Sequence, residues 1–361
     1  MVSTYCKNMI VYNLFLKEKC KNMKEKIQNR VDAMGYLREN NLEMKSTPKG
    51  RVIQGSITLA FDNLNSLRID VYAMEKSAEK GTENKAFKSL CNLLPSHTIT
   101  IKSQLDAQPS ATFDTVKDVV SKISAHGEFR EYAVRDDKGK EVSRVKVQLG
   151  NWFDSIHFAD PNKPFEPEAK FTVDAFIESI RPEMKAPAQG EEPEETGRYL
   201  ISALTPDYKG TMYRISYVTE EGAVSQYIAN NWRERESTYL TGVVSNLMKV
   251  EQKPGTANGF GQAAAGATST TFVDERIIRG GGESTIDADE YGMEQAGFTS
   301  EDVKKGLIAR DSVIADNTAR KAEKSNNSGS VSTPPAASKN FGFGNAGATA
   351  APSTGFDPKG F

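Results

Sequence analysis

Hydrophobic and polar residues alternate along two consecutive stretches in the first half of the chain. Within 51–61 and again within 67–73, every second side chain is apolar, apart from Arg51 and Gly55 in the first stretch. A period of two is the pattern of a β-strand that buries one face. Because the polar turn at 62–66 connects the two stretches, the pattern predicts a β-hairpin.

A mixture of strand and helix patterns follows this hairpin. Alternation indicates strands, whereas apolar residues three or four positions apart indicate helices. The predicted elements are, in chain order, a helix at 83–94, a strand at 97–103, a helix at 113–123, a hairpin at 132–150, a strand within 152–158 and a closing strand at 170–180. This part of the chain is therefore expected to be a β module that helices interrupt.

A polar segment at 182–196, with three prolines and five glutamates, has little to bury and predicts a linker. Beyond it the first hairpin is repeated. The dipeptide Gly-Arg opens a strand at 50 and again at 197, and each is followed by a strand that carries an arginine, Arg68 and Arg214. The closing strand at 170–177 also resembles 238–244. The self-similarity predicts two copies of one supersecondary unit.

The last third of the chain changes in composition. Gly, Ala and Thr dominate 253–271, which predicts a flexible linker. Further on, Thr299 can cap a helix with Asp302 at the reciprocal position. A stripe at helical spacing follows, consisting of Val303, Leu307, Arg310 and Ile314. The final segment holds three charges among Ser, Ala, Gly, Pro and Asn with four phenylalanines, and it cannot build a core.

These patterns divide the chain into seven parts. They are a basic leader at 1–47, module 1 at 48–181, the linker at 182–196, module 2 at 197–252, the flexible linker at 253–271, a small helical region at 272–324 and a disordered tail at 325–361. For the leader, a translation start placed too far upstream is an equal alternative.

Two β modules of roughly five strands each favour small Greek-key barrels of the OB type. A β-sandwich is the rival fold, but module 2, at about 55 residues, is short for seven strands. The expected fold class is mainly β, with two OB-like barrels, helical insertions, a short C-terminal helix and a disordered tail.

The composition limits which cellular compartment and which kind of binding surface can be expected. The chain has 46 Lys and Arg against 48 Asp and Glu, so any surface for a polyanion must be a local patch. Cys6, Cys20 and Cys91 are an odd number without metal-like spacing, which favours a reducing compartment. The apolar run at 9–16 is too short to cross a bilayer, so no membrane association is expected.

Catalytic and metal-binding motifs fail on inspection. The three histidines, His97, His126 and His157, are isolated from one another, and none forms a Cys-His motif with metal-like spacing. The segment 287–292 begins like a calcium loop, but Tyr291 and Phe298 stand where oxygen ligands belong. The glycines at 280–282 lack the Lys-Ser/Thr of a phosphate loop and are interpreted as a hinge. We therefore expect no enzyme activity, no cofactor and no metal.

The two Gly-Arg strands, Gly-Arg-Val-Ile at 50–53 and Gly-Arg-Tyr-Leu at 197–200, and the polar tail resemble the tandem OB-fold single-stranded-DNA-binding proteins of bacteriophages. The resemblance covers 48–250 and the tail, and it is one of architecture. It implies non-catalytic binding of single-stranded DNA in replication or recombination. It also implies a cytoplasmic location, which for a phage protein would be the cytoplasm of the host cell. It also implies contact between the tail and replication or recombination proteins.

The tail departs from that pattern at its end. Bacterial single-stranded-DNA-binding proteins end in several acids before a terminal Phe, whereas 355–361 holds one acid and one lysine. Recruitment of partners through an acidic tip is therefore in doubt.

Single strands are held by cations along the phosphates and by aromatic rings under the bases. The candidate contacts are Arg51, Arg68, Tyr72 and Trp152 in module 1 and Arg198, Tyr208, Lys209, Tyr213, Arg214, Trp232, Arg233 and Arg235 in module 2. Module 2 has the densest set, and the centre is expected near Arg198, Arg214 and Trp232.

Several of these residues have structural alternatives. Tyr213 can pack inside the barrel, Trp152 can plug it, and Arg144 with Lys146 fits a solvated strand face better than a binding one. A second hypothesis for the whole chain is a structural or adaptor protein of a phage particle, in which the aromatic residues anchor protein contacts.

Overall fold

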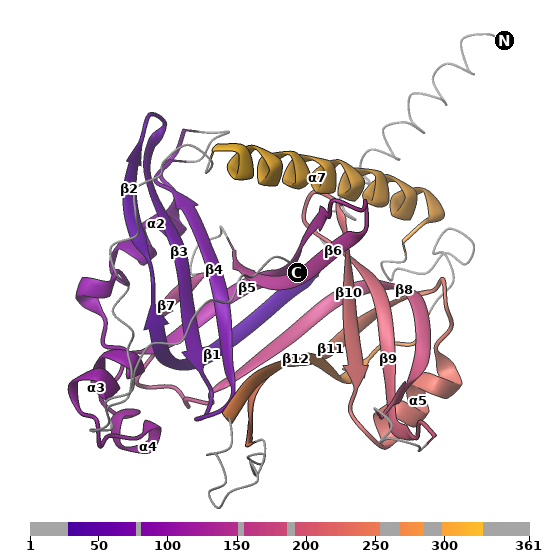
Figure 1. Cartoon of the computed structure of the whole chain (residues 1–361), viewed down its shortest axis with the longest axis horizontal. Helices are drawn as coiled ribbons and strands as arrows, with labels where there is room; N and C mark the ends of the chain where they lie inside the picture. The colour runs from indigo at the N-terminus through magenta and orange to yellow at the C-terminus, as the bar shows by residue number, and fades with distance from the viewer. Residues whose placement is uncertain are drawn as a thin grey trace, which may run out of the picture. The chain divides into compact units, whose positions relative to one another are not determined.

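The computed structural model describes residues 28–76, 81–150, 155–185, 192–252, 268–284 and 298–327 (Figure 1). The strands are β1 (Asn29–Asn40), β2 (Glu43–Thr47), β3 (Gly50–Ala60), β4 (Ser66–Met74), β5 (Lys122–Arg135), β6 (Glu141–Leu149), β7 (Ile156–Phe158), β8 (Glu168–Met184), β9 (Glu195–Pro206), β10 (Met212–Thr219), β11 (Ser237–Gln252) and β12 (Thr268–Gly281). The helices are α2 (Lys85–Cys91), η1 (Pro95–His97), α3 (Ile101–Ala107), α4 (Phe113–Val116), α5 (Ala223–Asn231) and α7 (Ser300–Asn327).

Five strands of the first half close into a barrel, called barrel 1 from here on. Strand β1 pairs with β3, β3 with β4, β4 with β6, β6 with β5, and β5 again with β1. The β4–β6 pair is parallel and the others are antiparallel. Helices α2, α3 and α4 lie between the third and fourth strands of this barrel. This order is that of the OB-type Greek-key barrel.

The second half repeats the same topology in barrel 2. Strand β8 pairs with β9, β9 with β10, β10 with β12, β12 with β11, and β11 again with β8. The β10–β12 pair is parallel, and α5 lies between the third and fourth strands. The predicted fold class, mainly β with two OB-like barrels, is therefore confirmed by the strand pairs.

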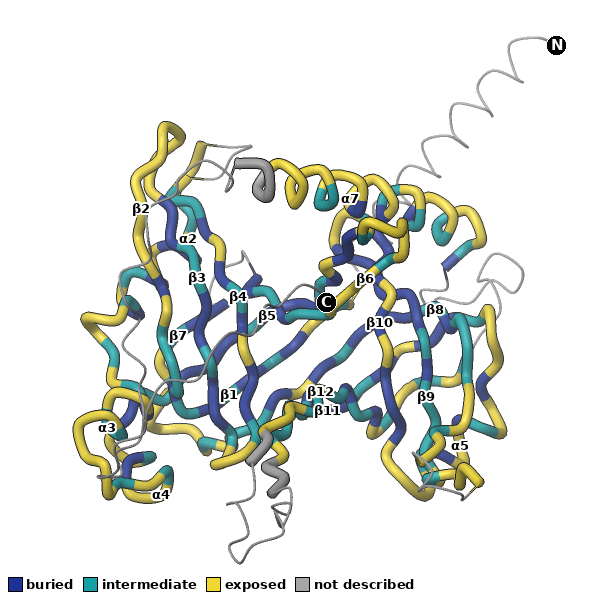
Figure 2. Tube along the Cα trace, viewed as in Figure 1, coloured by how far each residue is buried: buried dark blue, intermediate teal, exposed yellow. Residues whose placement is uncertain are grey.

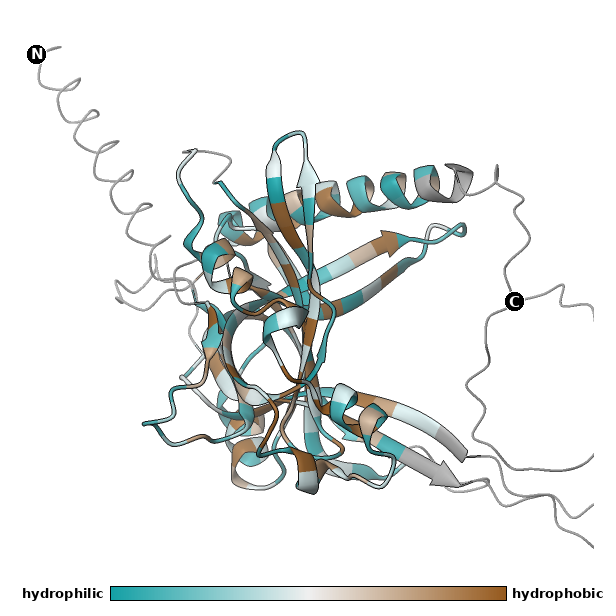
Figure 3. Ribbon diagram, turned by 90° about the vertical axis from the view of Figure 1, so that its left-hand side faces the viewer, coloured by the Kyte–Doolittle hydropathy of each residue, from teal (hydrophilic) through white to brown (hydrophobic). Residues whose placement is uncertain are grey.

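The first strands of the two barrels join them. Strands β1 and β8 are antiparallel partners, so the hydrogen bonding continues from one barrel into the other. Behind this seam three rings pack together: the ring centroids of Phe129 and Phe171 lie 5.7 Å apart, and those of Phe171 and Tyr217 lie 5.6 Å apart. Buried residues run along the central strands of both barrels (Figure 2), and hydrophobic residues alternate with hydrophilic ones along them (Figure 3).

The strand pairs divide the chain differently from the sequence prediction. Strand β1 lies inside the expected leader. It was not predicted because its inward positions, Val31, Ala33 and Leu37, include a small residue and give only a weak apolar pattern. Strand β8, expected to close module 1, is the first strand of barrel 2. Strand β12, expected in a helical region, is the fifth. The expected linkers at 182–196 and 253–271 each lie between two paired strands and overlap their ends, with 186–191 and 253–267 outside the described residues.

Three local predictions are also wrong. The expected strand at 97–103 is the end of η1 followed by α3, which Thr100 and Ser103 cap reciprocally. The helix expected at 113–123 ends at Val116, and Ile123 belongs to β5. The segments 170–177 and 238–244 are not equivalent: they are neighbouring partners, in the first and fourth strands of barrel 2.

The C-terminal helix begins as predicted. The backbone N–H of Asp302 donates to Thr299 Oγ1 at 3.1 Å, and the Thr299 N–H donates to the Asp302 carboxylate at 3.2 Å. Val303 and Leu307 pack against a small buried cluster that includes Met212 of barrel 2. At 28 residues, α7 is longer than the short helix expected. The rest of the expected tail, 328–361, and residues 1–27 of the expected leader lie outside the described residues.

Among the described residues, the model contains no helix with the length and apolar character needed to cross a membrane.

Candidate nucleic-acid interface

The outer face of barrel 1 carries cations and tyrosines on neighbouring strands. On β4, Arg68 and Tyr72 point away from the core, since the alternating residues Ile69 and Val71 are buried. Strand β6 runs parallel beside β4 and presents Arg144 and Lys146 on the same face. The alternation that buries one side of each strand thus places four cationic or aromatic side chains together on the other.

Tyr132 on β5 lies beneath two of these cations. Arg144 is its cross-strand partner, and the guanidinium carbon of Arg144 lies 5.3 Å from the centroid of the Tyr132 ring. The Lys146 ammonium lies 5.8 Å from the same centroid. Both distances are in the range of cation–π attraction. Tyr132 is 37% exposed and is therefore contacted by the cations while still reachable from solvent.

The row of cations and aromatic rings continues onto barrel 2. The Arg130 guanidinium, next to Lys146 across the β5–β6 pair, lies 6.0 Å from the ring centroid of Tyr208. Lys209 lies 5.4 Å from that centroid, and Tyr208 is 64% exposed. Asp207 holds this β9–β10 turn by accepting hydrogen bonds from the backbone N–H groups of Lys209 (2.8 Å) and Thr211 (2.9 Å). The exposed ring thus sits on a fixed turn.

We call this surface the basic strip. Its members are Arg68, Tyr72, Arg130, Tyr132, Arg144, Lys146, Tyr208 and Lys209. Two carboxylates pair with some of its five cations, and a third, Asp207, lies in the turn that carries Tyr208 and Lys209. Asp70 contacts Lys146 at 2.5 Å and Arg68 at 3.1 Å, and Glu128 contacts Arg130 at 2.6 Å. The basic strip therefore keeps an excess of positive charge although the whole chain is slightly acidic.

Asp70 orders two of these cations. Burial raises the pKa of the Asp70 carboxyl, but its hydrogen bonds to Lys146 and Arg68 and their charges outweigh that effect and lower the pKa below its ordinary value. Asp70 is therefore ionised at neutral pH and fixes the positions of Arg68 and Lys146. Arg144, in contrast, forms no ion pair with another residue in the described ranges.

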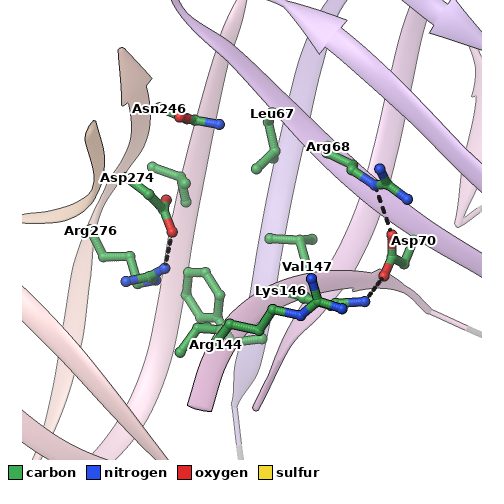
Figure 4. Close-up of a pocket in the computed structure, with 12 residues that line it drawn as sticks. Leu67, Arg68, Asp70, Arg144, Lys146, Val147, Asn246, Asp274 and Arg276 are labelled. Carbon is green, nitrogen blue, oxygen red and sulfur yellow. Dashed lines mark hydrogen bonds and ion pairs between the residues drawn. The ribbon is translucent and has the colours of Figure 1, made fainter. Parts of the chain in front are cut away.

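A cavity of about 230 Å³ lies between the two barrels beside the basic strip (Figure 4). It is lined by Leu67, Arg68, Asp70, Phe129, Arg144, Val145, Lys146 and Val147 of barrel 1 and by Val244, Asn246, Asp274 and Arg276 of barrel 2. A larger cavity of about 550 Å³ has three carboxylates, Asp62, Glu166 and Glu168, against Arg279 in its lining. Its charge suits a polyanion poorly, so the first cavity is the better candidate. The described residues form no His, Cys, Asp and Glu cluster suited to a metal ion.

Two aromatic residues expected to contact a ligand are instead buried. Trp232 is 2% exposed, and its indole Nε1 donates to the Gly282 carbonyl at 3.0 Å. Tyr213 is 5% exposed, and its hydroxyl donates to Asp207 at 3.1 Å. The glycines interpreted as a hinge have a packing role, since a Cβ on Gly281 would lie 3.0 Å from the Trp232 ring.

The expected arginines are separated from one another, and three are paired with acids. Arg51 contacts Glu75 at 2.5 Å, Arg214 contacts Glu178 at 2.7 Å, and Arg198 contacts Glu183 and Glu275 at 2.9 Å each. Arg233 and Arg235 are exposed beside buried Trp232. Trp152 lies outside the described residues. The structure thus does not form the expected centre at Arg198, Arg214 and Trp232.

Four of the expected contacts, Arg68, Tyr72, Tyr208 and Lys209, do fall on the basic strip. Sequence reasoning missed Arg130 and Tyr132, and it set aside Arg144 and Lys146 as a solvated strand face. The sequence signal for these four residues was that polar side chains alternate along β5 and β6 and face outward. This signal indicates a binding surface only once the two strands are known to lie beside β4.

The chain was compared with known families and structures. The model of a family described as YorF matches residues 27–312. A deletion mutant of the single-stranded DNA binding protein from Thermus aquaticus is similar at 10% identity and a TM-score of 0.37, over 72% of this chain and 95% of that one. A replication protein A heterotrimer bound to single-stranded DNA is similar at 10% identity and a TM-score of 0.17, over 69% of this chain and 49% of that one. No curated protein matches the chain.

Proposed function

The chain belongs to the YorF family, and we propose that it is a non-catalytic protein that binds single-stranded DNA along the basic strip. The observation that carries this proposal is the interleaving of exposed tyrosines with cations: Tyr132 and Tyr208 are 37% and 64% exposed, and each ring centroid lies within 6.0 Å of two cations, while Tyr72, 51% exposed, lies on the same strand face as Arg68. Cations that track phosphates and rings that stack with bases are the two requirements for holding a single strand.

The position of the basic strip on the barrel supports the same function. Strand β4, which carries Arg68 and Tyr72, is the third strand of barrel 1. The face of the second and third strands is one of the surfaces through which OB folds bind oligonucleotides. A duplex hides its base faces in the stack, so exposed tyrosines favour a single strand. The role that we propose is to cover single strands that are exposed during DNA replication or recombination.

Tyrosine variants of the full chain test this proposal. We expect Tyr132→Ala and Tyr208→Ala to weaken binding of a single-stranded oligonucleotide by about 1–3 kcal/mol each, because each removes one stacking ring. The matched control is Tyr227→Ala on α5, which removes a 43% exposed tyrosine outside the basic strip. A fluorescence anisotropy titration gives the dissociation constants. Equal losses in all three variants would contradict the assignment of the basic strip as the binding surface.

A further inference from the structure

The cavity between the barrels opens onto the basic strip, because the two share residues. Arg68, Arg144 and Lys146 belong to the strip and also line the cavity. In Figure 4 these side chains come from one side of the cavity, whereas Asn246, Asp274 and Arg276 come from the other. A single-stranded nucleic acid bound along the basic strip would therefore pass the mouth of the cavity.

The cavity combines aliphatic surface with the cations of the basic strip on one side and a polar wall of barrel 2 on the other. Leu67, Val145 and Val147 of barrel 1 and Val244 of barrel 2 supply aliphatic surface. Its volume of about 230 Å³ is close to the lower end of small-ligand pockets. The lining also carries four cations, Arg68, Arg144, Lys146 and Arg276, beside the carboxylates of Asp70 and Asp274. A nucleotide unit, which has a flat ring with a polar edge and an anionic phosphate, matches this combination of aliphatic surface and cations.

The polar wall is fixed by the strand register. Asn246 and Asp274 are direct cross-strand partners of β11 and β12, so an amide and a carboxylate stand side by side. Arg276 holds the carboxylate with a 2.5 Å hydrogen bond, while its Nη1 donates to the Ser216 carbonyl at 3.3 Å. Arg276 is 8% exposed and lies over the Phe129 ring, so it is a positioning residue for Asp274.

This wall also contains polar atoms without partners. Asn246 Oδ1 and Arg276 Nε are buried, and neither has a hydrogen-bond partner among the described residues. Buried polar atoms of this kind are uncommon in folded proteins and point to a bound polar group or a ligand. The edge of a nucleobase, which carries hydrogen-bond donors and acceptors next to each other, matches a neighbouring amide and carboxylate.

We infer that the cavity receives one base of the bound strand. The base lies between the aliphatic walls with its polar edge toward Asn246 and Asp274, and its phosphate contacts Arg144 and Lys146 at the mouth. This inference rests on the proposed function and adds a binding site for a single base at the junction of the barrels. The ligand is a nucleotide unit of a single strand.

An abasic scan tests the inference with the full chain. The probe is the shortest single-stranded oligonucleotide that keeps full affinity, in which one nucleotide at a time is replaced by an abasic site that retains its phosphate. We expect one position at which loss of the base weakens binding about tenfold. In Asn246→Ala and Asp274→Asn that position should become insensitive, whereas positions stacked on tyrosines keep their losses.

Tyr132→Ala is the matched comparison, because it should remove the sensitivity of a different position and leave the cavity position unchanged. Asp274→Asn keeps the side-chain volume at a 47% exposed site, and its thermal midpoint checks that the chain folds. An abasic profile that is the same in Asn246→Ala, Asp274→Asn and the unsubstituted protein would overturn the inference while leaving the proposed function intact. Failure of every oligonucleotide to bind would instead refute the proposed function.

Discussion

Arg310 on α7 donates two hydrogen bonds of 2.7 Å to the carboxylate of Glu131 on β5. Their side chains are 5% and 1% exposed, and the pair is completed by Glu141 on β6. Glu131 also accepts a 3.0 Å hydrogen bond from the backbone N–H of Arg214 on β10. Because Arg130 and Tyr132 flank Glu131, this buried contact joins α7, both barrels and the basic strip.

Removal of Arg310 should destabilise the protein strongly. In Arg310→Ala the buried carboxylate of Glu131 loses its cationic partner, and the expected loss is about 3–5 kcal/mol in the free energy of unfolding. Urea-induced unfolding measures it. The control is Lys305→Ala on the same helix, whose pair with Glu301 is exposed and worth at most about 1 kcal/mol. Similar losses of unfolding free energy in the two variants would show that the buried Arg310–Glu131 contact stabilises the protein no more than the exposed pair does.

The acid side of the stability profile should depend on Glu141. Its hydrogen bond to Arg310 lowers the pKa of the Glu141 carboxyl in the folded protein. A carboxyl with a lowered folded-state pKa stabilises the fold above its ordinary pKa, near about 4.3, and loses that contribution as the pH falls through the lowered value. We expect Glu141→Gln to be less stable than the unsubstituted protein at neutral pH and to approach it as the pH falls below the ordinary carboxyl pKa of about 4.3. Urea unfolding across this range tests the sign, and a difference that does not change with pH would refute it.

Salt dependence should separate the cations that contact phosphates from those engaged with acids. Arg144→Gln is expected to reduce the slope of log binding constant against log salt concentration by about 0.7, the value for one phosphate contact on a single strand. Arg198→Gln should leave the slope unchanged, because Arg198 is already paired with Glu183 and Glu275. Titrations at several salt concentrations measure both slopes. A reduced slope in Arg198→Gln alone would reverse the assignment.

Trp232 should matter for stability and not for binding. Trp232→Phe keeps an aromatic ring but removes the hydrogen bond to the Gly282 carbonyl, for an expected loss of about 1 kcal/mol in unfolding free energy. The dissociation constant for a single-stranded oligonucleotide should stay the same. Parallel thermal unfolding and binding measurements give both values. Weaker binding without a change in the free energy of unfolding would show that Trp232 contacts the oligonucleotide and would contradict this prediction.

The sequence predicts the repeated parts of the fold well where alternation is strong. The Gly-Arg strands β3 and β9 are indeed equivalent second strands, and Arg68 and Arg214 lie on the equivalent third strands. Strand β1 escaped because Ala33 and Gly35 give no apolar signal, although Gly35 is required where a Cβ would lie 2.9 Å from the Ala60 carbonyl oxygen. Strand β8 was given to the wrong barrel because the Pro- and Glu-rich segment 182–196, which connects it to its partner β9, has the composition of a domain linker, and its other partners, β1 and β11, are distant in sequence.

The binding surface was harder to predict than the barrels. Trp232 stands among Asn, Arg and Glu, so its neighbours suggest exposure, yet Gly281 from a strand fifty residues away leaves the space in which its ring is buried. Arg144 and Lys146 show the reverse: an ordinary polar strand face becomes a basic-aromatic surface once β4 and β5 lie beside it. Arg310 within an otherwise apolar stripe was a visible signal for a buried acidic partner.

The measurement that tests the central claim most directly is a titration of one labelled oligonucleotide as a single strand and as the duplex of the same sequence, at low salt. The exposed tyrosines of the basic strip predict clearly tighter binding of the single strand, and weakening of both complexes as the salt concentration rises. Equal affinity for the two forms, or no binding of the single strand, would contradict the account.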